Sequence, residues 1–177
     1  MSDVAHESIE IKSNDGCYNV IFDTCDIELI QKHYWHIWRS PSHDIKYAAT
    51  AIYGKNGKRT YTTMHRLIML PPPGLVTDHI NRNGLDNRRC NLRIATHSQN
   101  NANKAPMRGK TASVYKGVSK TPYGKWQAMT RTKGKDLYLG TFESEIDAAK
   151  AYDKKVFELH GEFAYLNFPE APKEISG

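Results

Sequence analysis

The sequence is poor in cysteine, and its three cysteines form no C-x-x-C pair. Cys17, Cys25 and Cys90 therefore predict neither a disulfide framework nor a zinc site built on cysteines. Long apolar runs are also missing, because the longest ends at the three prolines 71–73. A membrane helix needs about 20 apolar residues, so none is expected. No basic segment followed by an apolar one opens the chain, so we expect no secretory signal and a cytoplasmic location.

Acidic residues are scarce between residues 104 and 142, where nine Lys or Arg stand against one Asp. Residues 143–177 reverse this balance, with four basic residues against eight acidic ones. A basic block beside an acidic one favours a domain with one positive face, as a polyanion binder needs, although a solvated basic surface gives the same counts. Residues 1–60 are nearly neutral, which favours a role in completing the nuclease core over the alternative that they add DNA contacts.

Two successive patterns of secondary structure predict an α+β protein. In the N-terminal half, Asn56-Gly57 separates β-prone runs at 47–53 and 59–63, which predicts a hairpin. An apolar helix at 65–70, a strand at 75–80 and a helix from about 96 to 103 follow. In the C-terminal half the expected elements are strands at 114–119, 125–131 and 136–142 and a helix at 144–161. This half predicts a three-stranded antiparallel sheet with one helix.

The residues that could carry chemistry are Asp78-His79, followed by Asn91 and Asn100. Phosphodiester hydrolysis needs a base for the attacking water and a hard divalent cation to offset developing charge. Carboxylate and amide oxygens are suitable ligands for such a cation. Neighbouring residues at a strand end point to opposite sides, so one can face a metal while the other faces a water. Because an Asp-His pair is frequent by chance, the pair alone is a weak signal.

The whole segment HRLIMLPPPGLVTDHINRNGLDNRRCNLRIAT, continued by QNNANK, resembles the HNH nuclease motif of phage and intron-encoded homing endonucleases. The resemblance spans residues 65–104 and implies a ββα-metal fold. It implies that His79 is the general base, that Asp78 and Asn100 hold one Mg²⁺ (or Mn²⁺), and that Asn91 braces the loop bearing the base. No zinc is expected. His97 is a rival to Asn100, because many HNH proteins have a histidine as their last ligand.

Other residues near the motif receive simpler interpretations. Four arginines are expected to contact DNA phosphates: Arg66, Arg88, Arg89 and Arg93. His65 is expected to pack and hydrogen-bond beside the site, and Asn87 to stabilise a turn.

Residues 113–169 resemble the DNA-binding domain of plant ethylene-response factors (APETALA/ERF type), through YKGV, GKW, YLGTF, AAKAYD and LNFP. The resemblance implies a three-stranded sheet in the DNA major groove with the helix behind it. The expected DNA-contacting residues are Lys116, Lys120, Lys125, Trp126, Arg131, Lys133, Lys135 and Tyr138. A core role for Trp126 is the alternative. Ser119 and Thr121 stand where plant domains commonly have arginines, so a different or looser specificity is expected.

These observations predict a nuclease domain at 1–103, a linker at 104–113, an ethylene-response-factor-like domain at 114–169 and a tail at 170–177. The expected function is a metal-dependent, homing-type HNH endonuclease, encoded by a phage or other mobile element, that nicks or cleaves double-stranded DNA. One site per chain favours a monomer that nicks, and double-strand cleavage would need a dimer or two events. The alternatives are a non-catalytic DNA-binding regulator with a degenerate nuclease fold, and a protein that acts on RNA, which the major-groove sheet disfavours.

Overall fold

The computed structural model describes residues 5–40, 45–106, 113–132 and 134–169, which fall into two compact units. The N-terminal unit is Met1–Thr96 and the C-terminal unit is His97–Gly177. Both mix helices with small antiparallel sheets, which confirms the predicted α+β class. Among the described helices, none has the length and apolar character that crossing a membrane requires.

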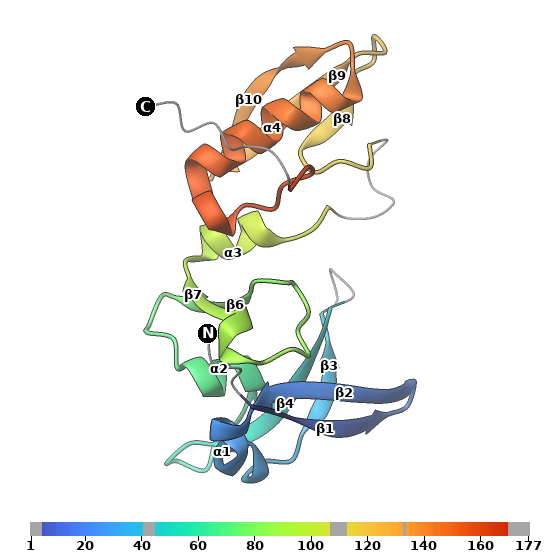
Figure 1. Ribbon diagram of the computed structural model, residues 1–177. Coiled ribbons are helices and arrows are strands. Elements are labelled where there is room, and N and C mark those ends of the chain that lie inside the picture. Colours follow the sequence, from blue (N-terminus) through green and yellow to red (C-terminus); the bar gives the residue numbers. More distant parts are fainter. Residues whose placement is uncertain (1–4, 41–44, 107–112, 133, 170–177) are drawn as a thin grey trace. The chain divides into compact units, whose positions relative to one another are not determined.

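The N-terminal unit holds three small antiparallel sheets (Figure 1). Its strands are β1 (His6–Ser13), β2 (Gly16–Asp23), β3 (His36–Arg39), β4 (Lys46–Tyr53), β5 (Arg59–Thr63), β6 (Val76–His79) and β7 (Leu92–Ala95). Its helices are η1 (Thr24–Asp26), α1 (Ile27–Gln31), α2 (Met64–Met69) and η2 (Arg89–Asn91). β1 pairs with β2, β4 lies between β3 and β5, and β6 pairs with β7. The predicted hairpin at Asn56-Gly57 is confirmed, with Gly57 at a φ of +72°.

One hydrophobic core supports the N-terminal unit. Buried side chains from β1, β2, α1, β4, α2 and β7 meet in it, among them Val20, Phe22, Ile30 and Met64. The loop between β6 and β7 is fastened to β2, because the Asn87 amide donates to the Ile21 carbonyl oxygen at 2.7 Å. The core thus fixes both the β6–β7 hairpin and the loop that closes it.

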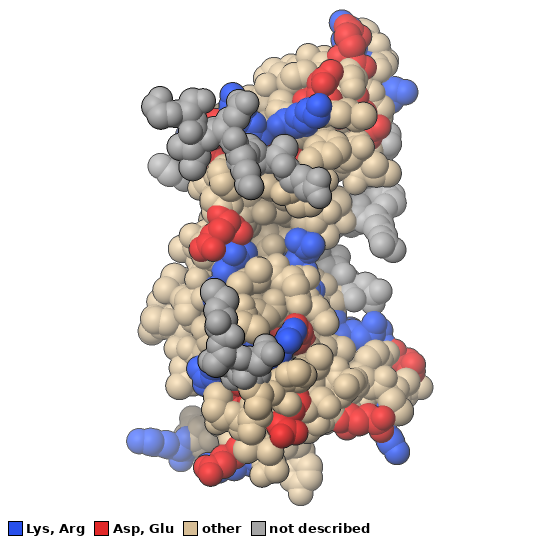
Figure 2. Space-filling view, in the orientation of Figure 1, with Lys and Arg blue, Asp and Glu red and all other residues tan. Residues whose placement is uncertain are grey.

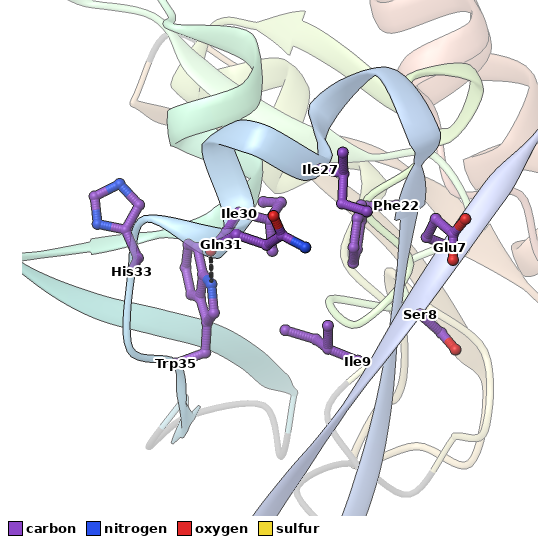
Figure 3. A pocket seen from close by; sticks show the side chains of 9 residues that line it. All are labelled: Glu7, Ser8, Ile9, Phe22, Ile27, Ile30, Gln31, His33 and Trp35. Atoms are coloured by element: carbon purple, nitrogen blue, oxygen red, sulfur yellow. Dashed lines mark hydrogen bonds between the residues drawn. The ribbon is translucent and has the colours of Figure 1, made fainter.

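A shallow pocket of about 270 Å³ opens beside this core, between the β1–β2 sheet and α1 (Figure 3). Its lining is mostly apolar and includes Ile9, Phe22 and Ile27. The indole Nε1 of Trp35, also in the lining, donates to the Ile30 carbonyl oxygen at 2.9 Å. None of the candidate catalytic residues lines it.

The C-terminal unit has the three strands and one helix that the sequence predicts, but the first strand begins at Val118 and not at 114, because residues 114–117 form a turn with Gly117 at a positive φ. Its elements are α3 (His97–Asn103), β8 (Val118–Lys120), β9 (Trp126–Thr132), β10 (Lys135–Phe142), α4 (Glu145–His160) and η3 (Gly161–Phe163). The sheet has the order β10-β9-β8 and is antiparallel, and α4 packs along it (Figure 1). Ala128, Ala149, Tyr152 and Val156 are buried between the sheet and the helix.

The helix α3 groups with the C-terminal unit, although the predicted domain limits assign it to the nuclease domain. Its Ala102 is buried in the core between α4 and the β8–β9–β10 sheet. The carbonyl oxygen of Ala102 accepts a hydrogen bond from the backbone N–H of Tyr165 at 3.0 Å. These tertiary contacts are invisible in a local sequence pattern. The boundary after residue 103 stays a prediction. Most of the predicted linker (107–112) and the predicted tail (170–177) lie outside the described residues.

Replacing Gly117 by alanine is expected to destabilise the C-terminal unit by more than about 1 kcal/mol. Gly117 has a φ of +75°, and a Cβ there would overlap the Tyr152 ring. Gly124 is the matched control, because its φ is +84° but nothing lies within 4 Å of an added Cβ. Denaturant unfolding of both variants separates the overlap from backbone strain. Equal losses would show that the Tyr152 ring moves aside at no cost.

Candidate active site

The β6–β7 hairpin brings the candidate catalytic pair to one buried end of a strand. Asp78 and His79 end β6 and are both buried, and their roles as site residues stay a prediction. Asp78 pairs with Arg93 across the hairpin, so their side chains share a face. Arg93 Nε donates to Asp78 Oδ2 at 3.0 Å, and Nη2 of the same guanidinium forms an ion pair with this oxygen at 2.9 Å. This arrangement places a carboxylate with a fixed orientation beside an imidazole.

Aromatic rings surround His79. Its ring centroid lies 4.6 Å from that of His65 and 5.8 Å from that of Tyr47, and Tyr47 and His65 are 5.4 Å apart. His65 Nε2 is 3.1 Å from Thr63 Oγ1, so the expectation that His65 packs and hydrogen-bonds beside the site is confirmed. Tyr47 belongs to β4, far away in sequence, and no local motif marks it.

Asn87 contacts the candidate base directly, which the sequence did not predict. Its Oδ1 is 3.3 Å from His79 Nε2, and its side chain is fully buried. An amide oxygen can only accept, so Nε2 carries the proton and Nδ1 keeps the lone pair. Asn87 therefore does more than stabilise a turn, because it fixes which imidazole nitrogen is basic.

Burial keeps the histidines neutral. It lowers the pKa of His79 below the usual 6.5, although Asn87 and the nearby Asp78 and Asp86 carboxylates oppose the change. Burial lowers the pKa of His65 further, aided by the positive charge that His79 would carry. Burial, followed by the charge of Asp78, raises the pKa of Tyr47 above 10. At neutral pH the site thus holds a neutral imidazole that can accept a proton.

Asn91 spans the loop that follows β6. Its Nδ2 donates to Asn81 Oδ1 at 3.0 Å and to the backbone carbonyl oxygen of Asp86 at 2.8 Å. Its Oδ1 accepts a hydrogen bond from the backbone N–H of Asn81 at 2.9 Å. These contacts tie the two ends of the loop together. They are the contacts expected of a residue that braces the loop behind His79, and its effect on catalysis stays a prediction.

Residues 69–102 match the family model of the HNH endonucleases. The chain carries an HNH endonuclease segment. A viral relative is similar over more of the chain, namely the uncharacterized HNH endonuclease L560 of Acanthamoeba polyphaga mimivirus. It is 36% identical over 96 residues, which are 54% of this chain and 49% of the relative.

Plant proteins form a second group of relatives. The dehydration-responsive element-binding protein 2D of Arabidopsis thaliana is 41% identical over 80 residues, 41% of this chain and 39% of that protein. The ethylene-responsive transcription factor 1 of Solanum lycopersicum is 45% identical over 58 residues, 31% of this chain and 24% of that protein. This chain spans less than half the length of each of these three relatives. It therefore joins an HNH segment to a segment similar to plant ethylene-response factors.

Two arginines of the HNH segment that were expected to contact phosphate hold internal ion pairs. Arg88 binds Asp86 through Nε at 2.8 Å and Nη2 at 2.7 Å, and Arg89 binds Asp26 at 3.0 and 2.6 Å. The Arg89 amide also donates to Asp23 Oδ2 at 2.8 Å. Asp23 and Asp26 lie close enough to suggest a cation site together with a neighbouring cysteine, but Arg89 already forms an ion pair with Asp26 and donates its backbone amide to Asp23.

The remaining ligand candidates lie on other elements. Asn100 and its rival His97 lie on α3, within the C-terminal unit, so their part in a metal site stays a prediction.

The other two arginines of the HNH segment differ in exposure. Arg93, which is expected to contact phosphate, binds the buried Asp78. Arg66 is exposed on α2. DNA contact by any of the four arginines stays a prediction.

Lys116 fastens α3 to the rest of the C-terminal unit. Its Nζ donates to the carbonyl oxygens of Ala102 and Lys104, both at 2.6 Å, at the end of the helix. Cations at a helix C-terminus are favourable, because the last carbonyl groups lack partners within the helix. This use of the ammonium group differs from the expected DNA contact.

The other expected DNA-contacting residues of this unit are distributed over the sheet. Arg131 and Tyr138 are exposed, and Arg131 pairs with Asp136 at 2.8 Å. Trp126 packs against the hydrophobic core of the C-terminal unit, which is the alternative role given for it above. The Nζ of Lys120 lies 5.7 Å from its ring centroid. Three further lysines complete the expected set: Lys125 forms an ion pair with Glu143, Lys135 is exposed, and Lys133 lies outside the described residues. Figure 2 shows Lys, Arg, Asp and Glu side chains interspersed on the face that it displays.

Proposed function

We propose that the protein is a metal-dependent HNH endonuclease of the homing type, which cuts double-stranded DNA that its C-terminal sheet selects. The observation that carries this proposal is the buried Asp78-His79 pair, with a neutral imidazole oriented by Asn87, inside the HNH segment. The plant relatives, which are named as transcription factors or element-binding proteins, support a DNA-binding role for the other segment.

The chemistry assigned to His79 is that of a general base. Its Nδ1 takes a proton from a water molecule as the oxygen attacks phosphorus, the bond from phosphorus to the 3′-oxygen breaks, and a 5′-phosphate results. Asn87 holds the Nε2–H during this step, so the imidazolium that forms stays oriented. Asn91 keeps the loop behind the base closed.

The donor atoms of the segment fit a hard divalent cation. Asp78 supplies a buried carboxylate whose orientation Arg93 fixes, and Asn100 would supply an amide oxygen. We assign these two residues to Mg²⁺ or Mn²⁺. When bound, the ion would supply charge stabilisation for the leaving 3′-oxygen. One such site in a chain favours one nick per protein molecule, and double-strand cleavage would need a dimer or two events.

Removing divalent metal is expected to abolish cleavage. Supercoiled plasmid carrying candidate target DNA should become open-circular in Mg²⁺, remain supercoiled in EDTA, and relax again when Mn²⁺ is added in excess. Mapping the ends should give a 5′-phosphate and a 3′-hydroxyl. Retarded migration of plasmid without a cut in either metal would instead support the non-catalytic DNA-binding regulator.

A further inference from the structure

The β3–β4–β5 sheet has two chemically different faces. Ile37 and Ala48, which pair between β3 and β4, pack in the first core. Side chains alternate along a strand and directly opposed residues share a face. The face opposite to the core therefore carries His36, Trp38, Tyr47, Tyr53, Arg59 and Tyr61.

Three aromatic rings of this face are open to solvent. The exposed fraction is 72% for Tyr53, 62% for Tyr61 and 45% for Trp38. The ring of Tyr61 lies 5.9 Å from that of His36, and the ring of Trp38 lies 5.8 Å from that of Tyr47. Several large exposed rings on one sheet face mark an interaction surface.

The charge of the same segment suits a polyanion. Between residues 45 and 66 the sequence has five Lys or Arg and no Asp or Glu, although residues 1–60 as a whole are nearly neutral. Lys55 and Lys58 lie in the β4–β5 hairpin, and the Arg59 guanidinium lies 5.0 Å from the Tyr61 ring centroid. Lys and Arg side chains project at the lower left of Figure 2, where Figure 1 shows this hairpin. Such a face suits the backbone of duplex DNA, because Tyr hydroxyls and the cations of Lys and Arg donate hydrogen bonds to phosphate oxygens.

The face is continuous with the candidate active site. Tyr47 belongs to it and contacts both His65 and His79, and Trp38 contacts Tyr47. We infer that this sheet face binds the nucleotides of the DNA strand next to the phosphate that His79 attacks, an inference that rests on the function proposed above. The N-terminal strands then serve substrate binding as well as the core, which is the role that the near-neutral charge of residues 1–60 favours.

Binding of a fluorescein-labelled duplex of random sequence to the full-length protein tests this surface. The titration is done in EDTA, so that it does not depend on cleavage. Tyr53→Ser combined with Tyr61→Ser should weaken binding about tenfold, because the shorter serine side chains cannot reach the DNA backbone and two contacts are lost. Arg59→Gln should reduce the slope of log affinity against log salt by about one, as loss of one phosphate contact does. Tyr34→Ser is the control, since Tyr34 is 97% exposed but is not on this face, and it should bind as the unaltered protein does.

A dissociation constant within about twofold of the unaltered protein for the Tyr53→Ser/Tyr61→Ser variant would overturn the inference. So would sedimentation showing a dimer of the unaltered protein that this variant loses, because the face would then join two copies of the chain. Failure of the nuclease function is recognised separately, by a plasmid that the unaltered protein binds and does not cut.

Discussion

Replacing His79 by alanine is expected to slow strand cleavage at least about a hundredfold and to leave DNA binding in EDTA unchanged. The buried imidazole is neutral at pH 7, and loss of a general base costs about 10²- to 10⁴-fold. Plasmid relaxation in Mg²⁺ measures the rate, and titration of a labelled duplex measures the affinity. Because the pKa of His79 is lowered below 6.5, the rate of the unaltered protein should fall only when the pH drops below that value, as the base becomes protonated.

A second measurement separates loss of the base from loss of the fold. Added imidazole should restore part of the rate of His79→Ala, since a small base can occupy the space that the side chain leaves. A misfolded protein would not respond in this way. His6→Ala is the matched control, because His6 is exposed on β1, away from the aromatic rings around His79. Cleavage by His79→Ala at the rate of the unaltered protein would remove His79 from the mechanism.

The elements of this site that could be predicted from the sequence are those that lie close together in it. Asp78 and His79 are neighbours on one strand, and Asn91 ends η2 just before the strand's partner β7, so a local motif contains them all. The sheet and helix of the C-terminal unit follow equally from short alternating runs and a helical stretch that ends at Gly161. Local sequence patterns are enough to predict those parts of the structure in which the contacting residues are close together in the sequence.

What the sequence could not reveal comes from pairs that only the folded chain brings together. Tyr47 reaches His79 from β4, and Arg89 finds Asp26 more than sixty residues away. Net charge was also misleading, because acidic residues elsewhere in 1–60 conceal the basic, aromatic face of the β3–β4–β5 sheet. The pairing of Arg88 and Arg89 with carboxylates shows the same limit. A cluster of arginines in a sequence does not tell how many of the charges the fold has already neutralised.

Replacing Asn87 by leucine is expected to lower the turnover of DNA about ten- to a hundredfold with little change in DNA affinity. Leucine fills a similar volume but cannot accept the Nε2–H of His79, so the imidazole can rotate or move its proton to Nδ1, the nitrogen that must stay basic. Asn87→Asp keeps an oxygen at the same place and should recover most of the rate, which a merely space-filling role does not predict.

The tautomer of His79 provides evidence that is independent of turnover. In the metal-free unaltered protein, ¹⁵N spectra of the imidazole should show a protonated Nε2 and an unprotonated Nδ1. In Asn87→Leu the two signals should move toward each other as both tautomers become populated, and in Asn87→Asp they should return. An unchanged tautomer in the leucine variant, together with an unchanged rate, would mean that burial alone orients His79. The partnership with Asn87 would then be a packing contact, and the selection of Nδ1 as the base would have to come from the rings of Tyr47 and His65.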